Sequence, residues 1–410
     1  MVDTPLVELG EFVDVTTGYP FASVHYSHDN SGIRLLRGDN IGQGRLRWAG
    51  VKRWPGDLSA DYLEYELAEN DVVLAMDRPW IEAGLKFSAV SRHDLPCLLV
   101  QRVARLRAKQ GLDQGFLRWL IASAEFTNYL LGTQTGTAVP HISGDQIRRY
   151  RVTLPPLPEQ HAIAEVLGAL DDKIEANRRF ARCCTELAIC QGTDLLSSGE
   201  GRWVSLEQVT DVSKGVSYRS DDLVSGRGWL VSLKCVGRDG SFQPEGLKPF
   251  SGPAKDAQVV EEGDILVAQT DVTQRAEVIG RPVRVERLGF GGRFVASLDF
   301  VIVRPHQELT REVLLVLLSQ REFRDHALGY CNGTTVLHMN SRAVPGYQFR
   351  LPDTDTATGI SVVVQPLFAR ADVAHRETRI IAALRDALLP KLLSGELRVR
   401  DAESLVEDAV

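Results

Sequence analysis

The sequence predicts a mixed α/β protein in which two related α/β domains are separated by two long antiparallel helices that form a coiled-coil spacer. Three observations predict this fold class: a repeat of domain size, short β-rich runs in both copies, and a heptad-patterned helix after each copy. The chain has 410 residues, of which 44% are hydrophobic and 25% are charged, and this composition excludes a largely disordered protein.

The repeat has a nearly constant spacing of 197 residues. Residues 7–18 read VELGEFVDVTTG, and residues 204–215 read VSLEQVTDVSKG. The segment GTAVPHIS at 136–143 recurs at the same spacing as GTTVLHMN at 333–340, whereas AENDVVLA at 68–75 recurs as EEGDILVA at a spacing of 193. This spacing is too long for a solenoid, whose repeats have roughly 20–50 residues, so it indicates the tandem duplication of a whole domain.

Short strands and one helical stretch are expected in the first part of each copy. The β-rich runs lie between Gly, Pro, Asn and Asp residues, as is typical of strands. The expected strands span residues 72–75, 97–106, 264–268 and 296–303. Apolar residues at helical spacing predict a helix over 114–131 and its counterpart over 310–328.

A long helix is predicted at the end of each copy, and the first one begins near residue 159. Apolar residues recur there at alternating spacings of four and three, which is a heptad seam, although the polar Asn177 interrupts it. The residues expected to pack along the two seams are Ile163, Leu167, Leu170, Ile174, Leu367, Ile381, Leu384 and Leu388. Since one helix cannot bury such a seam alone, the two helices are expected to pair antiparallel, with an approximate two-fold axis relating the copies.

Glycine and proline suggest the helix ends and the domain boundaries. Gly199 and Gly395 are natural residues to end the two helices, and Pro366 is expected either to kink the second helix or to mark its first turn. The expected divisions are 1–157 for the first domain, 158–200 for the first spacer helix, 201–352 for the second domain, 353–396 for the second spacer helix and 397–410 for a C-terminal tail.

Two similar modules at a fixed separation suit double-stranded DNA, on which equivalent contacts recur every helical turn. The net charge of −7 does not itself indicate a nucleic-acid binder, but most of the excess acid lies in the two long helical segments. The basic candidates in the first domain, interleaved with Trp48 and Trp54, are Arg34, Arg37, Arg45, Arg47, Lys52 and Arg53. Those in the second domain are Lys214, Arg219, Lys234, Arg238, Arg275, Arg281, Arg284, Arg287 and Arg293. The alternative for any one of them is a solvated charged face.

The repeated Gly-Thr loop is the second candidate for DNA contact. A Gly-Thr turn exposes a backbone N–H and a hydroxyl, which suit phosphate or base contact. The candidate residues are Gly136, Thr137, Gly333 and Thr334. The alternative is a structural turn before the last strand, and His141 and His338 in the same loops are interpreted as satisfied buried groups.

The sequence contains few patterns that indicate catalysis or metal binding. The chain lacks the Gly-x-x-x-x-Gly-Lys-Ser/Thr loop and the Gly-x-Gly-x-x-Gly pattern. The Asp-Asp-Lys sequence at 171–173 lies in the heptad helix and is interpreted as part of a polar stripe. Cys183, Cys184 and Cys190 lack the spacing of a zinc site and are interpreted as core and helix packing. The chain is therefore interpreted as a binder without a metal, a cofactor or chemistry of its own.

The sequence also indicates the compartment. No stretch approaches the roughly 18 uncharged apolar residues that a membrane helix needs, and the N-terminus has no basic region of the kind that begins a secretory signal. The six cysteines do not form the pattern of a disulfide framework. We therefore expect a location in the reducing cytoplasm, without membrane association.

Two helical phrases carry a family resemblance. LPPLPEQHAIAEVLGALDDKIEANRR at 154–179 and ALRDALLPKLLSGELRV at 383–399 resemble the conserved regions of the specificity subunit of type I restriction–modification enzymes. The resemblance covers the whole chain and implies two target recognition domains that each read one half of an asymmetric bipartite DNA site, across a gap set by the helices. It also implies a bacterial or archaeal source and a location at the nucleoid when the protein is bound to DNA.

The resemblance further implies that the chemistry belongs to partner subunits. Two adenine-N6 methyltransferase subunits would dock on the chain and use S-adenosylmethionine (SAM), and restriction subunits that require ATP and Mg²⁺ would join for cleavage. The sequence departs from the pattern at 353–368, which lacks the Pro-Glu-Gln start of the first helix, so a partner contact there is not implied.

Two alternatives remain open from the sequence. The first is a stand-alone bipartite DNA-binding regulator, which would not purify together with a methyltransferase. The second is a metal-dependent nuclease with an unrecognised site, which would cut DNA in the presence of Mg²⁺ without any partner.

Overall fold

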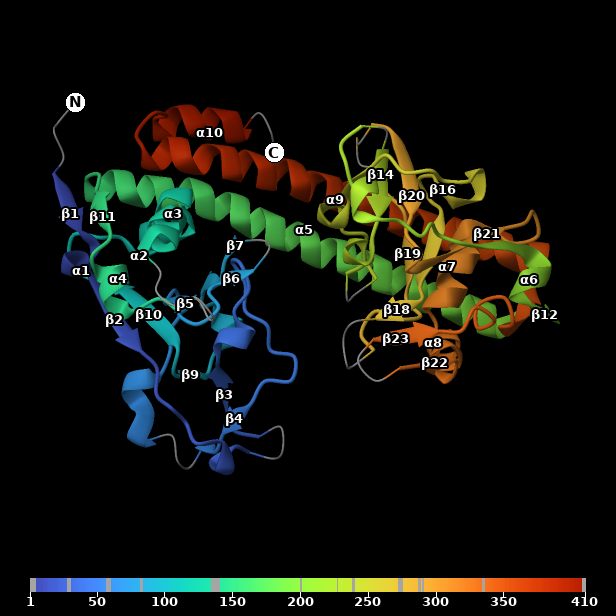
Figure 1. The fold of residues 1–410 in the computed structure, drawn as a ribbon, viewed down its shortest axis with the longest axis horizontal. Coiled ribbons are helices and arrows are strands. Elements are labelled where there is room, and N and C mark those ends of the chain that lie inside the picture. The colour runs from blue at the N-terminus through green and yellow to red at the C-terminus, as the bar shows by residue number, and fades with distance from the viewer. Residues whose placement is uncertain are drawn as a thin grey trace. The chain divides into compact units, whose positions relative to one another are not determined.

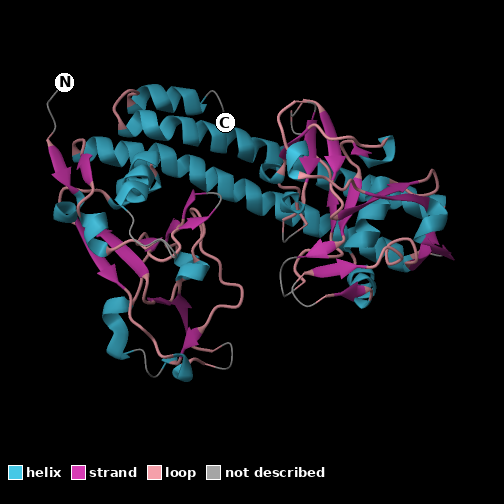
Figure 2. Ribbon diagram, in the orientation of Figure 1, coloured by secondary structure: helices cyan, strands magenta, loops and turns pink. Residues whose placement is uncertain are grey.

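The computed structural model describes residues 5–27, 31–56, 60–81, 84–133, 141–199, 201–226, 228–237, 240–271, 276–286, 289, 291–333 and 336–407 (Figure 1). The chain divides into two compact units, and each of them contains half of both long helices. Unit 1 consists of Met1–Glu175 and Thr378–Val410, and unit 2 consists of Ala176–Glu377. Both units contain helices and strands, so the expected mixed α/β class is confirmed (Figure 2).

Unit 1 is built around two sheets. The antiparallel four-stranded sheet has the order β2-β10-β5-β8, with β2 at Val13–Thr17, β10 at Val103–Ala108, β5 at Val72–Ala75 and β8 at Phe87–Ala89. The three-stranded sheet has the order β4-β3-β9, with β4 at Arg53–Trp54, β3 at Ile33–Leu36 and β9 at Cys97–Leu99. In this second sheet β3 is parallel to β9 and antiparallel to β4.

Unit 2 repeats the antiparallel sheet strand for strand and has one more strand in its second sheet. Its antiparallel sheet has the order β13-β21-β17-β19, with β13 at Thr210–Lys214, β21 at Phe300–Pro305, β17 at Ile265–Ala268 and β19 at Pro282–Arg284. Its second sheet has the order β15-β14-β20-β16, with β15 at Lys248–Phe250, β14 at Gly228–Val231, β20 at Arg293–Ala296 and β16 at Val259–Val260. Here β14 is parallel to β20, as β3 is to β9. The repeat in the sequence is therefore a repeat of the fold.

Small sheets complete each unit. The first and last strands of each copy pair antiparallel, β1 at Leu6–Glu8 with β11 at Arg151–Thr153, and β12 at Gly201–Ser205 with β24 at Gln348–Pro352. The two copies differ after β5 in unit 1 and after β17 in unit 2. Unit 1 has the pair β6 at Trp80–Ile81 and β7 at Gly84–Leu85, and unit 2 has the sheet β18-β23-β22 at Thr270–Asp271, Leu337–Met339 and Cys331–Asn332.

A glycine follows the first strand of the main sheet in both units because the neighbouring backbone leaves no room for a Cβ. A Cβ on Gly18 would lie 2.3 Å from the carbonyl oxygen of Val100, and a Cβ on Gly215 would lie 2.0 Å from that of Ser297. The residues after these glycines form parallel β-bridges at the same two places. The glycine that ends both copies of the repeated segment is thus required by close backbone packing.

We expect Gly215→Ala to lower the free energy of unfolding by about 1–3 kcal/mol, because backbone must move to accept the methyl group. Gly168→Ala is the matched control: no atom lies within 4 Å of a Cβ at this helical position, so the same change should raise stability by about 0.5–1 kcal/mol. Urea denaturation measures both changes. Equal stability of the two variants would contradict the packing argument.

Each predicted helix of the globular part is in fact two shorter helices. The stretch expected at 114–131 forms α2 at Gln114–Ala122 and α3 at Ala124–Thr133, which break at Ser123. Its counterpart forms α7 at Arg311–Ser319 and α8 at Arg321–Gly329. The physical reason is visible at Ser123, whose backbone is extended and whose hydroxyl donates to the carbonyl of Leu120 and accepts from the N–H of Phe126. A serine with this bonding ends one helix and caps the next.

The long helices are α5 at Leu157–Ser198 and α9 at Thr354–Leu393. In unit 2 they run antiparallel, because Ala181 and Cys184 pack with Ala371 and Ala374 while Gly199, which follows α5, lies against Thr356 near the start of α9. The seam positions Ile163, Leu167, Leu170, Ile174, Ile381 and Leu388 are buried in the core of unit 1, against which Leu384 packs as a partly buried residue, and Leu367 packs in the same way against a core of unit 2.

The start of α9 has a local cause. The carboxylate of Asp353 accepts a hydrogen bond of 2.7 Å from the N–H of Thr356, as an N-cap does, and this bond lowers the pKa of Asp353. Pro366 lies well inside the continuous helix, so it does not mark the first turn. Gly395 adopts a left-handed φ of +72°, as expected beyond the end of a helix, whereas Gly199 does not.

The segment expected as a tail contains another helix, α10 at Val399–Glu407, whose Ala402 is buried in the core of unit 1. The interpretation of all three helical cysteines as packing residues is wrong for Cys183 and Cys190, which are exposed, and only Cys184 of the three is buried. Among the described residues, no helix combines the length and the apolar character needed to cross a membrane.

A buried ion pair occurs at the same place in both units, and the sequence did not reveal it. In unit 1, the guanidinium of Arg107 donates to both carboxylate oxygens of Asp71, at 2.5 and 2.8 Å. In unit 2, Arg304 donates to Asp264 at 2.7 and 3.1 Å, and Arg311 adds a contact at 3.3 Å. The two carboxylates are 3% and 1% exposed, so the arginines neutralise a charge that water does not reach.

Candidate nucleic-acid interface

The basic candidates of the first domain lie on and between β3 and β4, with the 3-10 turn Gly38–Asn40 between them. Arg45, Arg47 and Lys52 are exposed, whereas Arg34, Arg37 and Arg53 are half-buried. Exposure therefore separates the six candidates into two groups of three.

The half-buried arginines contact other parts of the protein. Arg34 donates hydrogen bonds of 3.1 and 2.7 Å to the carbonyl oxygens of His93 and Leu95. Its guanidinium also lies 4.6 Å from the ring centre of Trp48, whose indole N–H donates to Asp94. Arg34 and Trp48 thus connect β3 to the segment before β9, and in these contacts they have a structural role.

Arg53 and Trp54 are similarly engaged. Arg53 donates to the carbonyl oxygen of Gly32 at 2.9 Å. Trp54 is 3% exposed and packs edge-on against Phe21 and Tyr62, so it does not offer its ring for stacking on a base. Arg37 forms an ion pair of 3.5 Å with Asp39, on a more exposed part of the turn.

The structure brings one sequence candidate, Arg47, close to two basic residues that the sequence did not single out. Lys86 is a buried residue, and this burial lowers its pKa; the positive charges of Arg47 and Arg78 lower the pKa further, against the opposing effect of Asp39. Arg47 and Arg78 are both exposed. The N–H of Lys86 donates to the carbonyl oxygen of Pro79 at 2.7 Å, which places Lys86 beside Arg78, and the exposed Arg47 and Arg78 offer positive charge suited to phosphate. We call Arg47, Arg78 and Lys86 the basic cluster.

Sequence spacing hid the basic cluster because its members come from separate segments. Arg78 follows β5 with a left-handed φ of +44°, and Lys86 precedes β8. Gly44, three residues before Arg47, donates its N–H to the carbonyl oxygen of Phe87 at 2.8 Å and so holds the loop against β8. The available signal was the end of the repeated strand 72–75, after which the exposed Arg78 lies between the half-buried Asp77 and the buried Pro79.

The Gly-Thr loop is described only in part. Gly136, Thr137 and Thr334 lie outside the described residues. Gly333 is exposed with a φ of +120°, and a Cβ there would lie 2.1 Å from the carbonyl oxygen of Val336. The glycine is therefore required by the turn itself, which is a structural reason for its presence.

The two repeated histidines are not buried, contrary to expectation. His141 is exposed, and its Nδ1 lies 2.5 Å from a carboxylate oxygen of Asp77, which also pairs with Arg102 at 3.0 Å. His338 is exposed on β23. Successive side chains of an extended segment face opposite sides, and both histidines lie on the exposed side.

The segments that contain these histidines occupy equivalent places in the two units. The N–H of Ile142 donates to the carbonyl oxygen of Met76, directly after β5. The N–H of Met339 donates to the carbonyl oxygen of Gln269, directly after β17. Each repeated loop therefore returns to the end of an inner strand of the antiparallel sheet, β5 in unit 1 and β17 in unit 2. In unit 1 the exposed Arg78 lies at the same end of β5.

The candidates of the second domain divide in a similar way. Lys214, Arg219 and Lys234 are exposed, and Arg293 is half-buried on β20. Arg238, Arg275 and Arg287 lie outside the described residues. Arg281 donates to the carbonyl oxygen of Glu277, and Arg284 pairs with Asp372 on α9, so both guanidinium groups have partners within the protein.

The Asp-Asp-Lys sequence of the first long helix has a structural role at its first residue. Asp171 on α5 accepts hydrogen bonds from Arg118 on α2 and from Arg385 on α9. Two guanidinium groups therefore neutralise this carboxylate, and they join three helices of unit 1. The contact also explains how a charged residue, Arg385, is tolerated at a seam position.

Comparisons with known proteins place these features in context. A family described as the type I restriction modification DNA specificity domain matches residues 4–180. The EcoAI specificity subunit of Escherichia coli is 37% identical over 169 residues, which cover 41% of this chain and 28% of that protein. The MjaVIII specificity subunit of Methanocaldococcus jannaschii is 34% identical over 178 residues, which cover 43% of this chain and 41% of that protein. The matches thus span less than half the length of these two relatives.

A solved structure extends the comparison to the whole chain at the level of fold. The crystal structure of a type I restriction–modification S subunit from M. genitalium matches with a TM-score of 0.54 at 12% identity, covering 96% of this chain and 97% of that one. These findings confirm the resemblance to type I specificity subunits.

Proposed function

We propose that this chain is the DNA specificity subunit of a type I restriction–modification complex and that each unit reads one half of a bipartite site in double-stranded DNA. The observation that carries the proposal is the duplicated α/β topology, since two copies of one recognition fold in one chain suit a target with two separate parts. The match of the first copy to a DNA specificity domain supports the same function.

The chain itself would bind and position, and partner subunits would catalyse. Two methyltransferase subunits, which use SAM, and restriction subunits, which use ATP and Mg²⁺, are the proposed partners. Apolar side chains that are exposed on the long helices, among them Phe180 and Leu187 on α5 and Val373 on α9, support a protein-binding role for these helices.

In unit 1 the basic cluster is the proposed phosphate contact. Arg47 and Arg78 are exposed and charged, and Lys86 adds to the field between β5 and β8. Base readout would then come from side chains of the loops around it, because phosphate contacts fix the register and base contacts specify the sequence.

The test is co-expression of the full chain with the methyltransferase of its host, followed by purification and by sequencing of modified adenines in the recipient genome. We expect a stable complex and methylation at one bipartite motif. A chain that does not associate with the methyltransferase would contradict the proposal, and so would an isolated chain that cuts DNA in Mg²⁺.

The double variant Arg47→Ala/Arg78→Ala tests the phosphate contact in the same complex. We expect weaker DNA binding and a salt dependence of log Kd that falls by about 2, one for each lost phosphate contact. The control is Arg151→Ala, which removes an exposed arginine on β11 that pairs with Glu8 at 3.8 Å. An unchanged salt slope in the double variant would contradict the role of the basic cluster.

A further inference from the structure

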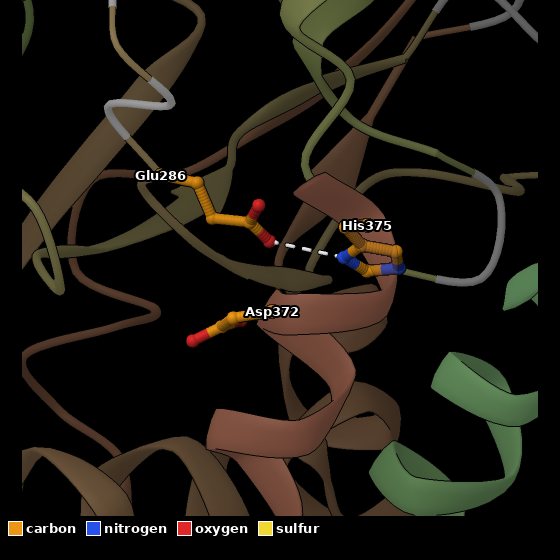
Figure 3. Close-up of side chains that lie close together, drawn as sticks. All are labelled: Glu286, Asp372 and His375. Atoms are coloured by element: carbon orange, nitrogen blue, oxygen red, sulfur yellow. Dashed lines mark hydrogen bonds and ion pairs between the residues drawn. The ribbon is translucent and has the colours of Figure 1, made fainter. Parts of the chain in front are cut away.

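A cluster of three metal-ligating side chains lies in unit 2, away from the proposed DNA contacts. Glu286 follows β19, and Asp372 and His375 are one helical turn apart on α9 (Figure 3). One potential ligand atom from each residue lies within 4.8 Å of the other two. Figure 3 shows the Glu286 carboxylate directed at the imidazole of His375. Donor atoms from two segments 86 residues apart thus lie close together, although Figure 3 shows the Asp372 carboxylate turned away from the imidazole.

The carboxylate of Glu286 is incompletely satisfied. Glu286 is 6% exposed, and its Oε2 is buried without a hydrogen-bond partner among the described residues. Its Oε1 lies 3.3 Å from Nδ1 of His375. A buried carboxylate oxygen with no partner is destabilising, so a group that binds it would stabilise the fold.

Asp372 adds a second partly buried carboxylate. Burial raises the pKa of Asp372, and the positive charge of Arg284, which pairs with its Oδ1, opposes this increase. Arg284 is held in place because its guanidinium also lies 5.6 Å from the ring centre of Phe368. This ion pair uses one oxygen of Asp372, and a carboxylate has lone pairs on two oxygens.

A protonated histidine is the competing explanation for the cluster. A charge-assisted N–H···O bond is normally about 2.7–2.9 Å long, whereas the Glu286–His375 contact is 3.3 Å. A single imidazole N–H would also leave Oε2 of Glu286 unsatisfied. By contrast, a tetrahedral Zn²⁺ ion with bonds of about 2.0–2.1 Å has neighbouring ligand atoms about 3.3 Å apart.

We propose that Glu286, Asp372 and His375 bind a divalent transition-metal ion of the Zn²⁺ class that connects the segment after β19 to α9. One imidazole nitrogen and two carboxylate oxygens suit Zn²⁺ better than Mg²⁺ or Ca²⁺, which take oxygen ligands. Water would complete the coordination. The largest separation in the cluster exceeds the ligand spacing of a tetrahedral ion, and rotation of the Asp372 side chain would close it.

The role of the ion is structural. It would fix the end of β19, an edge strand of the antiparallel sheet of unit 2, on α9, where Arg284 already makes one contact. The first long helix has Glu175 and Arg178 at the positions equivalent to Asp372 and His375 at the 197-residue spacing, and arginine is not a metal ligand. The site therefore belongs to the second copy alone.

The test is calorimetric titration of ZnCl2 into the full chain after removal of metals with a chelator, together with mass spectrometry of the metal content. We expect one Zn²⁺ per chain and a higher Tm in its presence. Glu286→Gln and His375→Ala should weaken binding by more than the roughly 10–100-fold that the loss of an outer-shell partner costs.

His306→Ala is the matched control, because His306 pairs with Asp211 at the same N–O distance of 3.3 Å outside the cluster. It should bind Zn²⁺ like the wild type. If a cluster variant fails to fold, the titration of the wild-type chain decides alone. The absence of stoichiometric Zn²⁺ binding by the wild type, or wild-type affinity in a folded His375→Ala chain, would overturn the proposal in favour of a protonated histidine.

Discussion

Replacing Arg107 by methionine is expected to lower the free energy of unfolding by about 3 kcal/mol. The change leaves the carboxylate of Asp71, which is 3% exposed, without the guanidinium that binds both of its oxygens. Breaking a buried ion pair by removing one partner costs about 3–5 kcal/mol, and the lower value applies because the Arg107 side chain is 39% exposed. Urea denaturation of the full chain measures the difference.

The second copy provides a graded comparison. Arg304→Met removes the equivalent guanidinium from Asp264, but Arg311 remains 3.3 Å from the same carboxylate, so a smaller loss is expected. Arg202→Met is the surface control: its ion pair with Glu308 is 2.7 Å long, yet both side chains are more than half exposed, and such pairs contribute about 0–1 kcal/mol. Equal losses for Arg107→Met and Arg202→Met would contradict the argument from burial.

These ion pairs show what the repeat could have revealed. Asp71 and Arg107 are 36 residues apart, and neither stands out alone, since Asp71 follows Glu69 just before an apolar run and Arg107 shares its strand with Arg105. Asp264 matches Asp71 at a spacing of 193, and Arg304 matches Arg107 at 197. Both copies keep a charged residue at the same place in or next to a strand-forming run, and such a charge needs a partner when it is buried. The second charge that both copies keep was the candidate for this partner. The duplication therefore contained the information.

The helical part was predictable because it depends on one periodicity. The heptad spacing identified positions such as Ile174 and Leu388, which are buried, since a long helix has a single apolar stripe to cover. The break at Ser123 was not predictable from the same pattern. Apolar spacing continues across it, and only the hydrogen bonds of the hydroxyl show that one helix ends and another begins.

The candidate DNA contacts were the least predictable feature. Composition locates arginines but does not say whether a guanidinium turns inward, as in Arg34 and Arg284, or outward, as in Arg47. That choice depends on carbonyl and carboxylate acceptors supplied by distant segments. Arg78 was missed for the same reason, because its position beside Lys86 is created by the fold.

Ile381→Ala is expected to lower the free energy of unfolding by about 2–5 kcal/mol, the cost of truncating a fully buried aliphatic side chain. Ile381 on α9 is 0% exposed and belongs to the core of unit 1, which also contains Leu170 and Ile174 of α5 and Phe116 of α2. The helix seam and the globular part share one core, so the cavity would destabilise both together. In thermal and urea unfolding, the midpoint measured by circular dichroism and the midpoint measured by fluorescence should shift by the same amount.

The adjacent residue isolates the contribution of burial. Ile380 has the same side chain on the same helix but is 60% exposed, so Ile380→Ala should change stability by no more than about 0.5 kcal/mol. Helix propensity changes equally in the two variants, because isoleucine becomes alanine in both. A difference below about 1 kcal/mol between them would mean that α9 is not packed into the core of unit 1 at this position. A larger difference in the free energy of unfolding, with DNA binding retained in Ile380→Ala, would show that the helix seam stabilises unit 1 by burying apolar side chains.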